Sequence, residues 1–114
     1  MTTRNLDRSE WQGFFDGLSR LLEGKQADIR VESLAIGSQV AVKWLPLLGI
    51  TYDPKDDLLE IALDGVDHMI RKPQRILAEV GTEGLKNLEI VDGDNVRQVV
   101  ELRDPLMLPA RAAT

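Results

Sequence analysis

The segment GVDHMIRKP contains the only histidine of this 114-residue chain. Its residue types could support acid–base chemistry, with His68 as a general base oriented by Asp67 or Asp64. Arg71 in the same segment and Arg75 just beyond it could then hold an anionic substrate or ligand. On this interpretation the protein is a small enzyme, or a binding protein for a small anion.

The same segment also has a structural interpretation. Val66, Met69 and Ile70 have helical spacing and could form a single turn that covers an edge of a sheet. His68 would then bond a backbone carbonyl, and Asp67 would cap the turn. We favour this interpretation, because adjacent side chains point in different directions in a helix or a strand and so do not form a dyad. We therefore predict no catalytic residue and lean against an enzyme.

Two acidic clusters could suggest a cation site. Asp53, Asp56 and Asp57 in DPKDD supply the oxygen ligands that hard cations prefer, but a lysine lies among them and they suit a solvated turn. The segment DGDN resembles the start of a calcium-binding loop. The twelfth position from Asp92 is Arg103, however, where such a loop needs a glutamate. We expect neither a metal nor a cofactor.

Composition excludes several classes of protein. The net charge of −5 works against binding to nucleic acid or to an anionic membrane surface. No apolar run approaches the roughly 20 residues that cross a bilayer, and the N-terminus lacks the apolar core of a signal peptide. The absence of cysteine excludes disulfides and thiolate sites, and it is typical of a reducing compartment. We expect a cytoplasmic protein.

The clearest element is a helix near the N-terminus. Asp7 and Glu10 have the spacing of a capping box, and Gly24 can take the left-handed conformation that ends a helix. Between them the apolar side chains recur at helical spacing and predict one buried face: Trp11, Phe14, Phe15, Leu18 and Leu22.

After Gly24 the period of the apolar residues changes to two, which indicates strands. We predict a hairpin turned at Gly37 and Ser38, then a bent strand past Pro46 with Leu48, Ile50 and Tyr52 on one face. Further alternating stretches predict strands over 59–63, 75–80, 88–90 and 96–102.

Short turns leave no room for parallel crossovers. The fold class is therefore α+β: an N-terminal helix packed on a curved, mainly antiparallel sheet of about six strands, with a partly closed barrel as an alternative. We expect one domain over residues 1–114, frayed at 1–5 and 110–114.

Three separated phrases, WLPLLGITYDPKDD, GVDHMIRKP and LRDPLMLP, occur in this order along the chain. With the opening TTR and RSEW, they resemble a family of short bacterial proteins known only as a domain of unknown function. The resemblance spans nearly the whole chain. It implies a complete domain, and it brings no assigned activity, cofactor or catalytic residue.

Apolar residues outside the expected core suggest a partner. Four leucines fall on the strand face opposite the main core stripe: Leu34, Leu45, Leu47 and Leu77. The segment PLMLP adds Leu106, Met107 and Leu108, which gain nothing from exposure to water. One helix can cover only one face of the sheet, so we predict a noncatalytic interaction or self-assembly module, such as a homodimer. The alternative is the anion-binding protein or enzyme that would use His68, Arg71 and Arg75.

Overall fold

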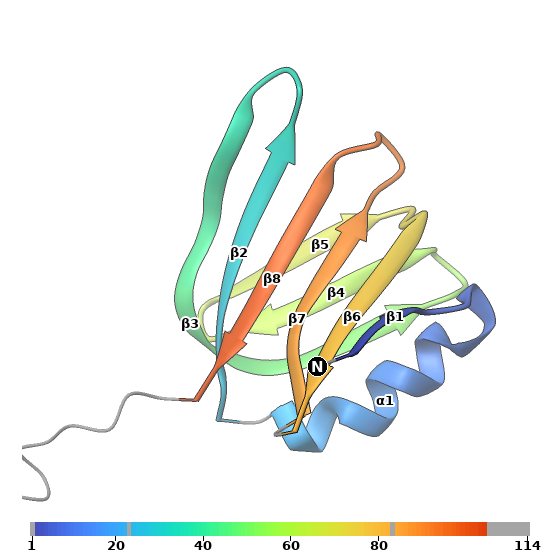
Figure 1. Ribbon diagram of the computed structural model, residues 1–114, viewed down its shortest axis with the longest axis vertical. Coiled ribbons are helices and arrows are strands. Elements are labelled where there is room, and N and C mark those ends of the chain that lie inside the picture. Colours follow the sequence, from blue (N-terminus) through green and yellow to red (C-terminus); the bar gives the residue numbers. More distant parts are fainter. Residues whose placement is uncertain (1, 23, 83, 105–114) are drawn as a thin grey trace, which may run out of the picture.

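The computed structural model describes residues 2–22, 24–82 and 84–104 (Figure 1). A short 3-10 turn, Arg8–Glu10, leads into the helix α1, Trp11–Leu22. The strands are β1 Thr2–Asn5, β2 Gln26–Ser33, β3 Gly37–Asp53, β4 Leu58–Leu63, β5 Val66–Arg71, β6 Arg75–Gly81, β7 Gly84–Val91 and β8 Arg97–Arg103.

The predicted helix is confirmed, and its start is fixed by local contacts. The Asp7 N–H donates to Glu10 Oε1 at 3.0 Å, which satisfies one of the donors that a helix start leaves free. The indole Nε1 of Trp11 donates to the Leu6 carbonyl at 3.0 Å. At the other end, Gly24 has the expected positive φ of 84° and turns the chain toward β2.

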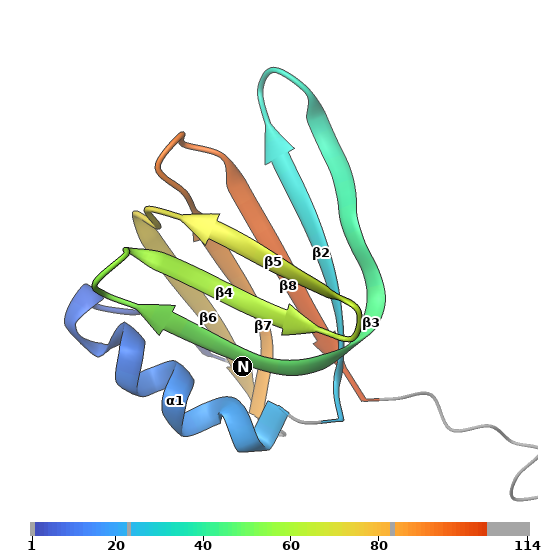
Figure 2. The ribbon, with the colours of Figure 1, turned by 180° about the vertical axis from the view of Figure 1, so that it is seen from behind.

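The strands form one antiparallel sheet in the order β1-β6-β7-β8-β2-β3-β4-β5. The α+β class is confirmed, but the estimate of six strands is wrong because the described residues form eight. The sheet is also not a closed barrel, since β1 and β5 lie at its two edges. Instead, β3 carries the chain from a large layer into a small one, in which β3, β4 and β5 lie across β6, β7 and β8 (Figures 1 and 2).

The bend in β3 explains an error in the predicted faces. Residues up to Pro46 pair with β2, whereas residues from Leu47 onward pair with β4. The β3–β4 register shifts between Leu47 and Gly49, so Leu47 and Ile50 both point inward although they are three residues apart. Leu48, predicted to face the core, is 60% exposed, and Leu47, predicted to face outward, is 2% exposed.

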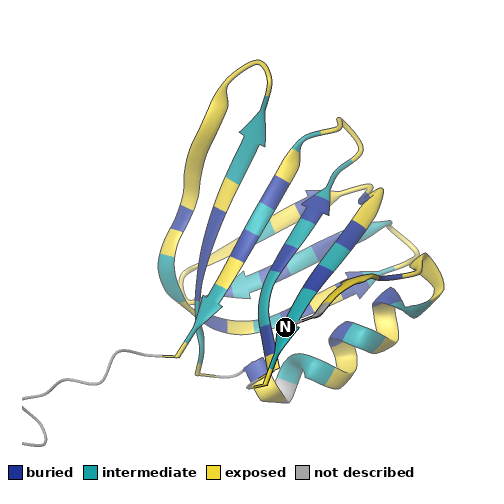
Figure 3. Ribbon diagram, in the orientation of Figure 1, coloured by how far each residue is buried: buried dark blue, intermediate teal, exposed yellow. Residues whose placement is uncertain are grey.

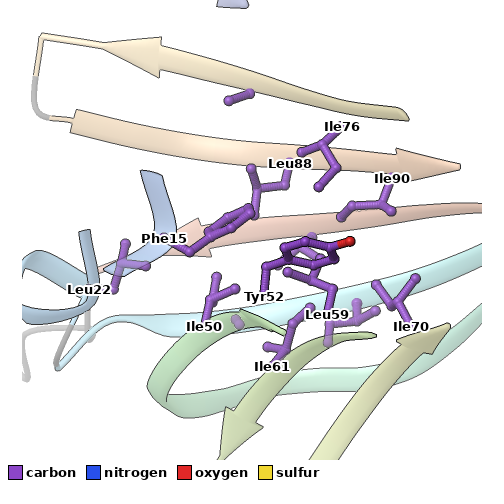
Figure 4. Packing of buried hydrophobic residues seen from close by; sticks show 14 of the residues in the cluster. Phe15, Leu22, Ile50, Tyr52, Leu59, Ile61, Ile70, Ile76, Leu88 and Ile90 are labelled. Atoms are coloured by element: carbon purple, nitrogen blue, oxygen red, sulfur yellow. The ribbon is translucent and has the colours of Figure 1, made fainter. Parts of the chain in front are cut away.

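The hydrophobic core fills the space between the two layers. Figure 4 shows Ile76, Leu88 and Ile90 of the large layer facing Ile50 and Ile61 of the small layer. The helix α1 packs beside β3 and inserts its buried side chains at one side of this space. Phe15 is fully buried there, whereas Phe14 is only partly buried against the core.

Three local expectations need correction, and a fourth falls on residues that the structure does not describe. Residues 1–5 were expected to fray, but Thr2–Asn5 form β1, which pairs with β6. The first hairpin turns at residues 34–36, so Gly37 begins β3 instead of the turn. Leu45 is partly buried against the core and does not add to an outer face. Residues 105–114, with Leu106, Met107 and Leu108, lie outside the described residues.

Candidate functional site

The histidine segment is a strand, which corrects the single turn expected there. Gly65, with a φ of 87°, closes a two-residue turn after β4, and β5 follows in register with β4. In β5 the side chains of His68 and Ile70 face the space between the layers, because alternate residues of a strand share a face. The helical spacing of Val66, Met69 and Ile70 was therefore misleading. The same segment also fits the alternation of a strand, and this strand pairs with β4.

His68 contacts a side chain of the opposite layer. Its Nε2 lies 2.6 Å from Oε1 of Gln98 on β8. The amide Nε2 of Gln98 donates to Oδ2 of Asp92 at 3.1 Å, so Oε1 is the acceptor that faces the histidine. His68 Nε2 is then the donor. This row of three side chains joins β5 to β8 through hydrogen bonds that are partly shielded from water.

The two arginines do not share the surface of His68. Arg71 has odd spacing from His68 along β5, so it lies on the opposite, outer face of the small layer. Arg75 precedes the buried Ile76 on β6 and lies on the outer face of the large layer. Asp67 also alternates with His68, and Asp64 is exposed in the preceding turn. The structure therefore brings His68 together with Gln98 and Asp92, and it separates His68 from the predicted anion-binding residues.

Two of the three acidic residues of the DPKDD turn have a side-chain partner within the described residues. Oδ1 of Asp53 accepts from the Lys55 N–H at 2.9 Å, which shapes the turn, and Asp56 is exposed. Oδ1 of Asp57 accepts from the Tyr52 hydroxyl at 2.6 Å. Within residues 2–22, 24–82 and 84–104, no three acidic or histidine side chains are placed to hold a metal ion.

Arg8 joins this turn to the start of the helix. Its guanidinium donates to Asp57 Oδ1 at 3.2 Å and to the Pro73 carbonyl at 2.9 Å, and it stacks over the Trp11 ring. Burial raises the pKa of the Tyr52 hydroxyl, and the hydrogen bond to Asp57 raises it further. The cluster ties three chain segments together, so its role is structural.

The most unusual surface lies at the tip of the β2–β3 hairpin, which extends beyond the rest of the sheet (Figures 1 and 3). Leu34 is fully exposed, Ile36 is 55% exposed and Val40 is 54% exposed. We call these three residues the hairpin tip. Turns usually hold glycine, asparagine, aspartate or serine, so the apolar LAI in this turn is a sequence signal for Leu34, already predicted to face outward, and for Ile36, but not for Val40.

The fold does not need leucine and isoleucine in this turn. The Ser33 Oγ accepts from the Ile36 N–H at 3.2 Å, and Gly37 supplies the positive φ of 74°. Beside the tip is a shallow hollow of about 300 Å³, bordered by Glu32, Leu34 and Asn95 among others. Arg97, at its rim, pairs with Glu32 and Glu89.

The hairpin also presents an unpaired strand edge. Residues 37–43 of β3 pair with β2 on one side, and no described strand pairs with their other side. Such an edge displays backbone N–H and C=O groups that can pair with another chain. An apolar tip and a free edge therefore occur on the same hairpin.

The described residues define a small α+β protein, with one helix beside an eight-stranded antiparallel sheet folded into two layers. No helix among the described residues is long and apolar enough to span a membrane. The chain belongs to a family of unknown function, DUF5335, whose sequence profile matches residues 2–111. This confirms the resemblance carried by the three phrases.

A curated relative covers almost the same length. An uncharacterized protein of Aquifex aeolicus strain VF5 is 34% identical over 110 residues, which is 96% of this chain and 99% of the relative. The search of solved structures gave no match. The family assignment therefore identifies the chain without assigning it an activity.

Proposed function

We propose that this protein is a noncatalytic self-assembly module whose docking element is the β2–β3 hairpin. The observation that carries the proposal is the hairpin tip, where Leu34, Ile36 and Val40 expose large apolar side chains that contribute nothing to the described core. An exposed apolar cluster of this kind is typical of a protein interaction site. The polar groups around it, Glu32 and Arg97, resemble the polar rim of such a site.

A second copy of the chain is the partner that best fits the free edge. Residues 37–43 can pair antiparallel with the same residues of another copy about a two-fold axis, because each edge offers both donors and acceptors. That arrangement would place the two copies of Val40 near the axis, and each hairpin tip would lie against the bent end of the partner's hairpin. Strand addition supplies backbone hydrogen bonds, and the apolar side chains supply the burial.

The expected association is moderate. Full burial of a valine, leucine or isoleucine side chain contributes about 1.5–3 kcal/mol, so the two hairpin tips together contribute up to about 9–18 kcal/mol. Association itself costs about 4–15 kcal/mol in lost motion. The gain from burial and the cost of association are therefore of similar size, and the net charge of −5 on each copy adds repulsion. We therefore expect a dimer that dissociates on dilution.

Sedimentation velocity over a series of protein concentrations tests the proposal. We expect the parent protein to form dimers, and we expect L34S/I36S to associate at least tenfold more weakly. The matched control is L48S, because Leu48 is also an exposed leucine of β3 but lies beyond the bend. A parent protein that stays monomeric, or equal association of the parent and both variants, would overturn the proposal.

A further inference from the structure

A groove with no described occupant lies at the end of the molecule opposite the hairpin tip. It consists of two adjoining hollows that share Lys25, Gly84 and Leu85. One hollow, of about 180 Å³, is lined by the last leucines of α1. The other, of about 210 Å³, is bordered by Leu102 and Asp104 at the end of β8. We call the two hollows together the base groove.

The helix side of the base groove is apolar and uncovered. Leu18 is partly buried against the core and Leu22 is fully buried, but Leu21 is 70% exposed. With Leu85 these side chains form an apolar wall that would be stabilised by a covering apolar segment. No described residue of the chain covers Leu21.

The chain itself supplies such a segment at this place. Asp104 borders the groove, and its Oδ1 accepts from Lys25 Nζ at 2.9 Å. This ion pair fixes the position of Asp104, so the segment that follows it begins at the edge of the groove. Those residues read PLMLP and include three large apolar side chains in succession.

The segment can reach the groove without stretching the fold. An extended chain spans at most about 3.3–3.6 Å per residue, so two residues beyond Asp104 could reach up to about 7 Å and four residues up to about 14 Å. Pro105 and Pro109 restrict the residues before them to extended backbone, which suits a segment laid along a groove. A short tether also gives an effective concentration in the millimolar range, which favours the chain's own segment over a second copy.

We propose that Leu106, Met107 and Leu108 dock in the base groove of their own chain and cover Leu21. The docked segment would connect the end of α1 to the end of β8, which the Lys25–Asp104 ion pair already joins. This proposal is independent of self-assembly through the hairpin tip, because the groove and the hairpin are built from different residues.

Paired cysteines test the docking directly, because the full-length chain has no cysteine of its own. In L21C/L108C a docked segment places the two thiols within disulfide distance. The control is L48C/L108C. Leu48 is a similarly exposed leucine that follows Leu47, whose N–H bonds the Lys25 carbonyl at 2.8 Å, so it lies near the groove without lining it.

We expect L21C/L108C to form a disulfide within one chain at least tenfold faster than L48C/L108C under mild oxidation, as followed by mass spectrometry. Equal rates in the two variants would overturn the proposal, because an undocked segment meets both positions. Disulfides formed only between chains, at Leu21, would also overturn it, because the occupant would then be a second copy.

A pair of truncations gives an independent measurement. Removal of residues 105–114 should expose the groove, so that an apolar fluorescent dye binds more strongly and Tm falls by about 5 °C or more. Removal of residues 110–114 alone should change neither the dye signal nor Tm. If the longer truncation matches the full-length protein in both measurements, the segment does not dock and the proposal fails.

Discussion

Trp44 has a φ of 46°, the left-handed backbone conformation, at the point where β3 passes from the large layer into the small one. This conformation costs a residue with a Cβ roughly 1–2 kcal/mol, and glycine does not incur that cost. Glycine instead loses about 0.5–1 kcal/mol relative to alanine through the entropy of the unfolded chain. Taking the difference, we expect W44G to be more stable than W44A by up to about 1.5 kcal/mol, with a central value of about 0.75 kcal/mol.

Comparing these two variants removes the contribution of the indole. Both variants lose the stacking of the Arg103 guanidinium, which lies 3.9 Å from the centre of the Trp44 ring, so this loss cancels in the difference. Urea unfolding followed by the fluorescence of Trp11, the remaining tryptophan, gives the two free energies of unfolding.

A control for this prediction is Ala41, an exposed residue of the same strand without a positive φ. There the substitution A41G should lower stability by about 0.5–1 kcal/mol, which is the ordinary effect of glycine in a strand. If W44G is less stable than W44A by the amount that A41G is less stable than the parent protein, the backbone at Trp44 is not left-handed.

Two further predictions concern the core and the Tyr52 hydroxyl. Phe15→Ala should lower the free energy of unfolding by about 3–5 kcal/mol and Phe14→Ala by clearly less, since only Phe15 is fully buried; equal losses on urea unfolding would contradict this. Folding raises the pKa of Tyr52 above its ordinary value of 10.0. The protonated hydroxyl therefore stabilises the fold fully below about pH 10, and this stabilisation is lost as the pH rises through the pKa of the folded state. Melts between pH 9 and 11 should therefore show a steeper loss of Tm in the parent than in Tyr52→Phe, and parallel losses would refute the cause.

Local patterns were sufficient for several elements. The helical stripe and the Asp7–Glu10 spacing predicted α1, because both depend on residues close in sequence. Alternation predicted most of the strands for the same reason. The strands β1 and β5 were missed: β1 is short and polar, and its pairing partner β6 lies more than 70 residues away. In β5, apolar residues at helical spacing obscured the alternation.

In the candidate site, too, residues close in sequence could be predicted and contacts between distant residues could not. Residue types made His68, Arg71 and Arg75 look like one cluster because they are close in sequence. Strand alternation and the two-layer arrangement place them on separate surfaces, and they give His68 a distant partner, Gln98, that no local pattern indicates. Side chains on one short segment can share a site only if the backbone turns them to one face.

The sequence by itself determined the α+β class, the helix and its apolar face, the antiparallel pairing and the family. These properties follow from periodicity, turn residues and motif order along the chain. Only the tertiary structure decided which apolar residues face inward after the bend at Trp44, and that Ile36 and Val40 remain exposed beside Leu34, which strand alternation had already placed outside the core. The physical reason is that one shifted residue in a β-ladder exchanges the two faces of a strand, and the shift depends on neighbours that are distant in sequence.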